Sequence, residues 1–463
     1  MSGLAIILVK RGYSISGSDQ NINNSLKNLI SHGVNIFKTQ SAANIEKICS
    51  NKNTNPIVIV STAIPTTNPE LRAAKNKKLE ILHRSDLLAS LINNQKSIVV
   101  AGSHGKTTTS TIITTLLALN KQDPTAIIGG IVPFYKSNGH SGLGKLLVAE
   151  ADESDGTIIK FKGSIGLITN LELDHTNHYK NLSSLIKIMK EFGSNSKKLV
   201  VNYDCEILRE NFQNCIYWST KQIQGIDFAA IPTLINGKET IANFYEKGEL
   251  IDEITIPLPG IHNLSNTVGA IAACRLSDIP FAEIKKIIHK LESPNRRFQY
   301  RGIWKERQFV DDYAHHPSEV EATISISRLM ISSRKSFLPL TPKRVIAVFQ
   351  PHRYSRTRDF LIEFSNSLLE ADSVILAPIY GAGEDKIDGI NSQSLAHQIK
   401  IKKPSLSVAV ADNVDHLINL IKSISQPSDL ILMMGAGNIN KLWNKIQIDE
   451  NIDENSTCIR QAA

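Results

Sequence analysis

The sequence predicts an α/β protein of three domains, each built on a mainly parallel, doubly wound sheet. Short apolar segments typical of buried strands alternate with longer segments of helical period along most of the chain. At 463 residues the chain is too long for one hydrophobic core, since single cores stop growing near roughly 250 residues. An apolar run that leads into a glycine loop and then a helix, "VVAGSHGKTTT" at residues 99–109, is typical of such a sheet. We expect domains at residues 1–96, 97–297 and 298–463.

The first domain has the pattern of a βαβ-type unit without its beginning. Residues 2–11 have helical period, and residues 13–18 and 57–61 are strand-like. A helix that leads into a strand is the second half of such a unit, so this domain lacks its first strand and its glycine loop. Because that strand lies centrally in the sheet, we expect Met1 to be an internal methionine. About 20 further residues upstream would supply a strand of roughly 5 residues with its loop and leader.

The second domain has the pattern of a nucleotide-binding sheet. Its glycine loop is followed by a helix from Lys106 to about Asn120, and further helices are expected at 265–275 and 281–291. Between Gly225 and Pro259, short alternating segments with glycine turns predict a small antiparallel insertion. The expected parallel strands are residues 98–100, 146–150, 166–170 and 199–202.

The third domain repeats the alternation of strand and helix, which predicts another doubly wound sheet. Residues 449–463 at its end are polar, and we expect them to fray. The expected strands, each followed by a helical pattern, are residues 308–313, 344–349, 373–378, 407–411 and 430–435.

Composition excludes several classes of protein. The longest apolar runs fall far short of the ~20 residues of a membrane-spanning helix, and no basic segment precedes the N-terminal apolar stretch as in a secretion signal. Five widely spaced cysteines without a CxxC pair argue against a disulfide framework and a zinc knuckle, so we expect a cytoplasmic protein. The net charge of +8 comes from scattered lysines, which favours anionic metabolites over nucleic acid as partners. We expect no membrane partner, and a monomer or weak homo-oligomer.

The glycine loop is the strongest candidate for a phosphate-binding site. Backbone N–H groups at the start of the following helix can point at an anion. Lys106 would reach the outer phosphates, and the Thr107 hydroxyl would bind Mg²⁺. Position 100 is Val, so only the shorter GxxGKT form is present; an ordinary strand–turn–helix junction is the alternative. The candidate nucleotide-binding residues are Gly102, Ser103, His104, Gly105, Lys106, Thr107 and Thr108.

Two later motifs place polar groups at the ends of predicted strands. Glu150 in "VAEADESD" is positioned to hold Mg²⁺ beside the phosphates, although an acidic helix N-terminus fits the acids after it equally well. His175 follows the strand of "ITNLELDHTNHY" and would be a structural residue if taken singly.

Paired amides and paired arginines suggest two further binding groups. Asn263 and Asn266 lie three apart on one helix face and are suited to the edge of a base, while helix capping by Asn263 is the alternative. Arg353 and Arg356 have the spacing to grip one planar carboxylate together, while a solvated basic helix start is the alternative.

Taken together, nine motifs resemble the Mur ligases, in the order found in the members that join L-alanine to UDP-N-acetylmuramate. They are "GSHGKTTT", "VAEADESD", "TNLELDH", "PGIHNLSN", "NRRFQ", "DDYAHHPSEV", "FQPHRYSRTRDF", "APIYGAGE" and "GAGNIN". The resemblance spans nearly the whole chain. It implies a uridine-nucleotide domain, a central ATPase domain and a C-terminal amino-acid domain, with ATP and Mg²⁺ as cofactors. It also implies that the γ-phosphate goes to the lactyl carboxylate and that the amine of alanine then attacks the acyl phosphate.

The resemblance also implies a role for each candidate residue. Catalysis would involve Lys106, Glu150, His175 and Arg297, and the metal would be held by Thr107, Glu150 and His175. Asn263 and Asn266 would bind adenine, and Asp312 or its neighbour Asp311 the ribose. Arg297 would reach the phosphates from the hinge. The residues implied for the amino acid are Tyr313, His315, His352, Arg353 and Arg356.

Two other functions remain open at this point. One is the ligase that reattaches a recycled tripeptide to the same sugar nucleotide, although "EADESDG" favours alanine. The other is a catalytically silent nucleotide-binding protein. The amine that drives ADP release would separate them.

Overall fold

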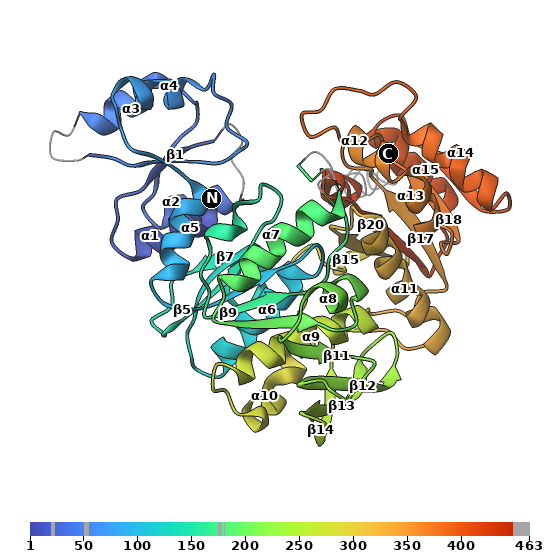
Figure 1. The fold of residues 1–463 in the computed structure, drawn as a ribbon. Helices are drawn as coiled ribbons and strands as arrows, with labels where there is room; N and C mark the ends of the chain where they lie inside the picture. Colours follow the sequence, from blue (N-terminus) through green and yellow to red (C-terminus); the bar gives the residue numbers. More distant parts are fainter. Residues whose placement is uncertain (20–23, 51–54, 175–177, 180, 448–463) are drawn as a thin grey trace, which may run out of the picture.

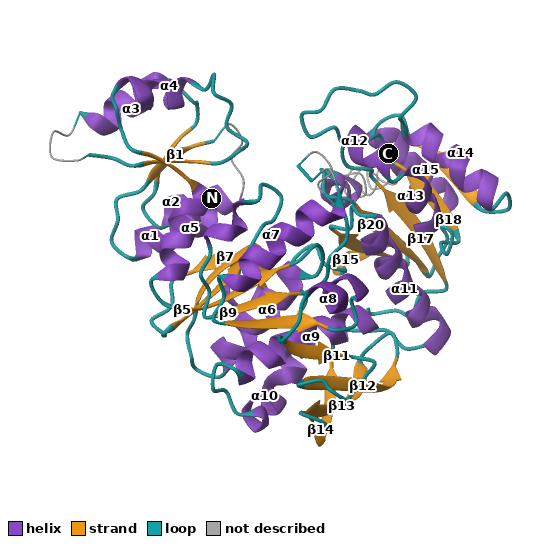
Figure 2. Ribbon diagram, viewed as in Figure 1, coloured by secondary structure: helices purple, strands orange, loops and turns teal. Residues whose placement is uncertain are grey.

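In a computed structural model, described for residues 1–19, 24–50, 55–174, 178–179 and 181–447, the chain forms three regions that follow one another along the sequence (Figure 1). Strands gather inside each region and helices lie around them (Figure 2). The predicted α/β class is therefore confirmed. No helix in these ranges is long and apolar enough to cross a membrane.

The described residues of the N-terminal region form four three-residue strands in two separate parallel pairs. Strand β1 pairs with β2, and β3 pairs with β4. The alternation of helix and strand follows the prediction, but the single expected sheet is not formed, because no described strand joins the two pairs. Its elements are α1 (Ser2–Lys10), β1 (Ser16–Ser18), α2 (Asn24–Ser31), β2 (Asn35–Phe37), α3 (Ala42–Cys49), β3 (Val58–Val60), α4 (Pro69–Asn76), β4 (Ile81–His83) and α5 (Arg84–Asn93).

The central region is built on a ten-stranded sheet of order β14-β13-β12-β11-β10-β9-β5-β8-β6-β7. Strand β5 lies between β9 and β8 and is parallel to both. Its strands are β5 (Lys96–Ala101), β6 (Thr125–Val132), β7 (Ser137–His140), β8 (Leu146–Glu150), β9 (Ile165–Ile168), β10 (Lys198–Asn202), β11 (Ile216–Ser219), β12 (Phe228–Ile235), β13 (Thr240–Glu246) and β14 (Glu249–Ile256).

Helices cover both faces of this sheet, because its central strands are apolar on both sides. Side chains of α6 and α9 pack in one core cluster, and side chains of α5 and α7 pack in a second. Strands β12–β14 are antiparallel, as predicted for this stretch, and they continue the central sheet through β11. The helices are α6 (Lys106–Leu119), α7 (Leu182–Ser194), α8 (Glu206–Asn211), α9 (Ile261–Arg275) and α10 (Phe281–Ile287).

The C-terminal region holds a six-stranded sheet of order β15-β16-β20-β17-β18-β19. The five predicted strands are parallel, as expected. Strand β15 is antiparallel and was not predicted from the sequence. The strands are β15 (Gln299–Trp304), β16 (Arg307–Asp312), β17 (Arg344–Phe349), β18 (Ser373–Leu376), β19 (Ser407–Val410) and β20 (Asp429–Met434).

The helices of this region again cover two faces of the sheet. Helices α11, α13 and α14 contribute to one core cluster, while α15 contributes to the other. They are α11 (Pro317–Ser333), α12 (Tyr354–Asp359), α13 (Leu361–Ser367), α14 (Ser392–Lys402) and α15 (Val414–Ile424).

Candidate active site

The loop of residues 102–105, between β5 and α6, requires glycine at two positions. Gly102 has φ +125° and Gly105 has φ +80°, in the region that favours glycine. A Cβ atom on Gly102 would lie 2.2 Å from Thr169 Oγ1, and one on Gly105 would lie 2.5 Å from Asn266 Oδ1. The loop is therefore fixed in shape by its neighbours before any ligand arrives.

Lys106 is held inside this loop by its own backbone and by one carboxylate. Its Nζ atom donates to the carbonyl oxygens of Gly102 at 2.6 Å and Ser103 at 3.0 Å, and to Glu153 Oε1 at 2.9 Å. Burial opposes the charge, but Glu153 and then Glu150 outweigh it and raise the pKa of Lys106 above its ordinary value. Burial also raises the pKa of Glu153 to about 7, although Lys106 lowers it. An arriving phosphate would therefore meet a protonated lysine.

Thr107 and Glu150 lie side by side at the carboxyl ends of the parallel strands. The Thr107 hydroxyl donates to Glu150 Oε1 at 2.9 Å, and the Gly129 N–H donates to Glu150 Oε2 at 2.7 Å. A Cβ on Gly129 would lie 2.8 Å from both Glu150 oxygens, so the carboxylate needs glycine there. A hydroxyl beside a carboxylate is an oxygen donor set that fits Mg²⁺. The third predicted ligand, His175, lies outside the described residues.

The two amides at the start of α9 have different environments. Asn263 is buried and its Nδ2 donates to the Pro259 carbonyl at 2.9 Å, which satisfies the backbone where the helix begins. Asn266 lies against Gly105 of the loop, and its Oδ1 accepts from Thr109 Oγ1 in the first turn of α6 at 3.3 Å. Their binding of adenine stays a prediction.

Glu319, in the first turn of α11, joins the C-terminal region to the loop. Its carboxylate lies 3.2 Å from His104 Nδ1 and 3.4 Å from Arg297 Nη1, and it accepts from the His315 N–H at 3.1 Å. Burial would raise its pKa, but His315, His104 and Arg297 outweigh burial and hold it well below the ordinary value. An ionised carboxylate therefore holds Arg297 close to the loop, and the contact of this arginine with the phosphates stays a prediction.

The two aspartates that end β16 are buried and contact other groups of the protein. Asp312 accepts from the backbone N–H groups of Phe298 at 2.6 Å and Ala314 at 2.7 Å, and burial raises its pKa to about 6. Asp311 is fully buried, with Arg296 Nε 3.4 Å from its Oδ2. Their predicted contact with ribose stays a prediction.

The predicted amino-acid residues gather in the C-terminal region, but the two arginines contact different acids. Arg356 is buried and donates to Asp174 Oδ1 from Nη2 at 2.6 Å and from Nε at 3.2 Å. Arg353 Nη1 lies 3.3 Å from Glu384 Oε1. The shared grip on one carboxylate stays a prediction. The rings of the remaining set lie near one another, with centroids 5.2 Å apart for Tyr313 and His315 and 5.9 Å for His315 and His352.

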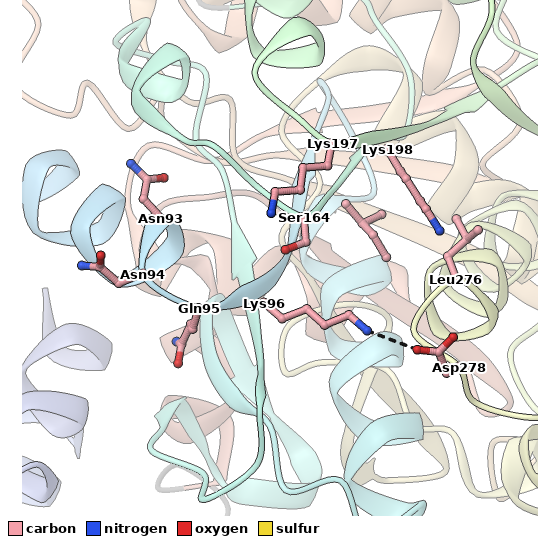
Figure 3. Close-up of a pocket in the computed structure, with 10 residues that line it drawn as sticks. Asn93, Asn94, Gln95, Lys96, Ser164, Lys197, Lys198, Leu276 and Asp278 are labelled. Carbon is pink, nitrogen blue, oxygen red and sulfur yellow. Dashed lines mark hydrogen bonds and ion pairs between the residues drawn. The ribbon is translucent and has the colours of Figure 1, made fainter.

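A cavity of about 550 Å³ lies elsewhere, at the amino ends of the central strands (Figure 3). Lys96, Ile165 and Lys198, the first residues of β5, β9 and β10, line it. The phosphate-binding candidates lie at the carboxyl ends of the same sheet, where doubly wound folds bind their ligands. This cavity is therefore separate from the candidate site.

Comparison with known protein families accounts for this arrangement. Residues 1–96 match the family model described as Mur ligase family, catalytic domain. Residues 100–274 match the Mur ligase middle domain, and residues 296–437 match the Mur ligase glutamate ligase domain. The chain belongs to the Mur ligase family. The resemblance predicted from the nine motifs is thus confirmed.

Curated relatives of this Mur ligase match over almost its whole length. The UDP-N-acetylmuramate–L-alanine ligase of Prochlorococcus marinus strain MIT 9303 is 56% identical over 458 residues, covering 99% of this chain and 93% of the relative. The ligase of the same name from strain MIT 9313 is 57% identical over 446 residues, covering 96% and 91%.

Solved structures share the fold. The UDP-N-acetylmuramate–alanine ligase of Thermotoga maritima has a TM-score of 0.80 at 22% identity, covering 98% of this chain and 97% of that one. A murein peptide ligase from Psychrobacter arcticus has a TM-score of 0.69 at 18% identity, covering 97% and 96%. At these identities the likeness shows the Mur ligase fold alone.

Four residues of this Mur ligase site were not predicted from the sequence. Glu153 and Asp174 lie inside quoted motifs, but the chemistry was assigned to their neighbours Glu150 and His175. Glu319 also lies inside a quoted motif, "DDYAHHPSEV", where the chemistry was assigned to Tyr313 and His315. Gly129 had only the signal of a glycine pair in a strand. Each one acts through a contact made between separate elements.

Proposed function

We propose that this chain joins L-alanine to the lactyl carboxylate of UDP-N-acetylmuramate, converting ATP to ADP and phosphate, in the cytoplasmic synthesis of peptidoglycan precursors. The observation that carries the proposal is a glycine loop in which Lys106 is paired with Glu153 near the charge of Glu150, with Glu319 of the C-terminal region at the edge of the loop. The names of the curated relatives identify the substrates.

The central region, residues 97–297, would bind ATP. Backbone N–H groups of the loop and the Lys106 ammonium would hold the outer phosphates, with Arg297 approaching from the hinge. To do so, Lys106 must exchange its contact with Glu153 for one with phosphate. Asn263 and Asn266 would bind adenine, and Asp311 or Asp312 the ribose.

Thr107 and Glu150 would hold Mg²⁺, together with His175. The hydroxyl and carboxylate already lie 2.9 Å apart and offer the oxygen donors that this ion prefers. When bound, the ion would neutralise charge on the transferred phosphoryl group.

The reaction would proceed in two stages, because a carboxylate at neutral pH is a poor electrophile. The lactyl carboxylate oxygen attacks the γ-phosphorus and ADP leaves, which gives an acyl phosphate. The amine of alanine then attacks the acyl carbon, phosphate leaves, and an amide forms. Lys106 and Arg297 stabilise charge during the first stage, and closure of the site excludes water until the amine arrives.

The C-terminal region, residues 298–463, would position alanine. Arg353 and Arg356, helped by Tyr313, His315 and His352, would bind its carboxylate. Since each arginine already pairs with an acid, the substrate carboxylate must displace Glu384 or Asp174. Residues 1–96 would hold the uridine nucleotide, and the chain would act as a monomer or weak homo-oligomer.

Release of ADP in the presence of UDP-N-acetylmuramate tests this function. We expect release to depend on L-alanine, and the panel of amines should include glycine, L-serine and the L-alanyl-γ-D-glutamyl-meso-diaminopimelate tripeptide. Faster release with the tripeptide would identify a recycling ligase instead. Absence of ADP with every amine, in a chain that still binds ATP, would identify a silent nucleotide-binding protein.

A further inference from the structure

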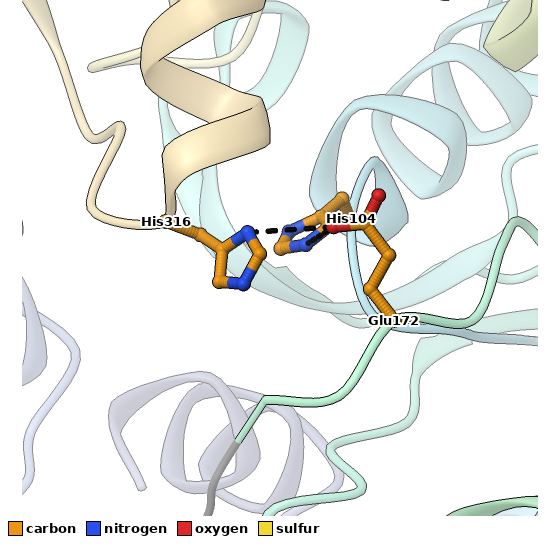
Figure 4. Close-up of side chains that lie close together, drawn as sticks. All are labelled: His104, Glu172 and His316. Atoms are coloured by element: carbon orange, nitrogen blue, oxygen red, sulfur yellow. Dashed lines mark ion pairs between the residues drawn. The ribbon is translucent and has the colours of Figure 1, made fainter. Parts of the chain in front are cut away.

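Three side chains from three separate segments meet at the edge of the phosphate-binding loop (Figure 4). His104 belongs to the loop, Glu172 follows β9, and His316 precedes α11 of the C-terminal region. One potential ligand atom from each lies within 4.8 Å of the other two. His104 and His316 are largely buried, while the Glu172 side chain is 44% exposed. The group thus joins two regions of the protein and opens to solvent through its carboxylate.

The distances within this group match those of a tetrahedral metal site. Bonds of about 2.0 to 2.1 Å at tetrahedral angles place neighbouring ligand atoms roughly 3.3 Å apart. Glu172 Oε2 lies 3.2 Å from His104 Nε2 and 3.4 Å from His316 Nδ1. Two of the three distances between ligand atoms therefore already match a tetrahedral site. The third distance, between the ligand nitrogens of His104 and His316, is within 4.8 Å.

Supporting contacts behind the three side chains fit a metal site as well. His104 faces Glu172 through Nε2 and Glu319 through Nδ1, at 3.2 Å each. A carboxylate on the far nitrogen of a ligating histidine fixes its ring and tautomer. Ser318 Oγ donates to Glu172 Oε2 at 2.6 Å and so orients the third ligand. The same hydroxyl lies 2.7 Å from His316 Nδ1, and an ion bound to this nitrogen would replace that contact.

The protonation states favour a cation at this place. Burial, and then the charge of His104, lower the pKa of His316 to about 4, so this imidazole is neutral near pH 7. Hydrogen bonding to His104 lowers the pKa of Glu172 to about 2, despite opposition from burial. Burial opposes the charge on His104, but hydrogen bonds to Glu172 and Glu319 raise its pKa to about 9. Without a metal ion, a protonated His104 lies between the carboxylates of Glu172 and Glu319.

A route for an ion is present beside the group. A cavity of about 330 Å³ is lined by Glu172 and His316. Two further carboxylates, Glu321 and Glu363, lie on its wall. A hydrated cation entering there would meet acidic side chains before it reached the imidazoles.

We propose that His104, Glu172 and His316 form a binding site for one divalent transition-metal ion of the zinc type, which ties the phosphate-binding loop to α11. Imidazole nitrogen is a ligand that suits Zn²⁺, unlike the oxygen donors of Thr107 and Glu150. The site is separate from the proposed Mg²⁺ position and does not rest on the identity of the substrates. Binding joins the central and C-terminal regions.

Co²⁺ is the probe for this site, because a four-coordinate Co²⁺ ion absorbs visible light strongly and a six-coordinate one weakly. The full chain, freed of metal with a chelator and then exchanged into Mg²⁺ in excess, is titrated with CoCl₂. We expect intense visible bands that saturate at one ion per chain and disappear when ZnCl₂ is added. Weak six-coordinate bands alone, or a thiolate charge-transfer band that shows binding to cysteine, would overturn the proposal.

Variants then identify the ligands. His316→Gln and Glu172→Gln should each weaken Co²⁺ binding by roughly 100-fold or more, since even supporting residues around a metal cost 10- to 100-fold. His397→Gln, an exposed histidine on α14, is the matched control and should bind as the wild type does. Wild-type affinity in a folded His316→Gln chain would contradict the assignment.

A measurement on the wild type alone covers the case in which the variants do not fold. The groups that face His104 are Glu172, Glu319 and His316. Paramagnetically shifted NMR signals should come from two histidine rings. Shifted signals from a single ring would contradict the proposal.

Discussion

The candidate site has a phosphate end and an amino-acid end, and the side chains of the two ends differ in how far they must rearrange to bind a ligand. At the phosphate end, Lys106 and Thr107 begin helix α6 and Glu150 ends strand β8. Backbone groups contact Lys106 and Glu150, and the Thr107 hydroxyl contacts Glu150. At the amino-acid end, Arg353 and Arg356 are each paired with an acid, and Asp174, the partner of Arg356, belongs to the central region.

This difference indicates how the two ligands are recognised. A phosphate needs only to replace Glu153 as the partner of one lysine. Under the proposed function, the amino acid would exchange ion-pair partners, and that exchange would break a contact between the central and C-terminal regions. Binding of alanine would then be coupled to the arrangement of the regions, whereas binding of ATP would depend mainly on a preformed loop.

The largest effect is expected at the phosphate end. Lys106→Ala should lower turnover by roughly 100-fold or more, the scale for loss of one preorganised group that stabilises transition-state charge. Folding should survive, as checked by thermal unfolding. Lys190→Ala, on the exposed side of α7, is the matched control. Near wild-type turnover in a folded Lys106→Ala chain would remove the loop from the mechanism.

His104 should make stability depend on pH. Its pKa is raised from 6.5 to about 9, so its contribution is fully present below pH 6.5 and is lost as the pH rises through 9. The shift corresponds to about 3 kcal/mol of unfolding free energy. Denaturant unfolding with a chelator present should show this loss in the wild type and in His397→Gln, but not in His104→Gln. A loss of the same size in His104→Gln would assign it to other groups.

Arg356→Ala should weaken the binding of alanine more than the binding of ATP. It would leave the substrate carboxylate underpaired in a closed site, at a cost of about 2 kcal/mol or more. It would also leave Asp174 without its arginine, so the protein should lose some stability as well. Calorimetric titration with each ligand checks this. Weaker binding of ATP together with unchanged binding of alanine would mean that the C-terminal region has another role.

Arg353→Ala should have the smallest effect on the protein itself. This arginine is 41% exposed in its ion pair with Glu384, and such pairs contribute about 1 kcal/mol or less to stability. We expect an unchanged unfolding midpoint together with a raised KM for alanine. An unchanged KM would mean that Arg356 binds the carboxylate of alanine without help from Arg353. The comparison of the two ends of the site would then depend on Arg356 alone.

Much of the phosphate end could be predicted from the sequence, because its signal is local. Strand β5, the two glycines and Lys106 are contiguous in the sequence. Strand β8 ends at Glu150, as its pattern indicated. The partner groups could not be predicted. Glu319 reaches His104 from 215 positions away, and Asp174 reaches Arg356 from 182. No local pattern contains such a contact.

The fold shows the same limit. Buried parallel strands such as β17 and β20 carry continuous apolar runs, and these were predicted. The antiparallel β15 contains Gln299, Arg301 and Gly302, so it lacked that pattern. The separation of β1–β2 from β3–β4 depends on pairing, which strand-like residues do not determine.

The central claim is that the γ-phosphate is transferred to the lactyl carboxylate before the amide forms. It can be tested with UDP-N-acetylmuramate whose lactyl carboxylate carries heavy oxygen, incubated with ATP, Mg²⁺ and L-alanine. Mass spectrometry of the released phosphate should find one carboxylate oxygen transferred for each amide formed, since attack on the acyl phosphate expels that oxygen with the phosphorus. Release of wholly unlabelled phosphate, with amide formed, would contradict the acyl-phosphate mechanism.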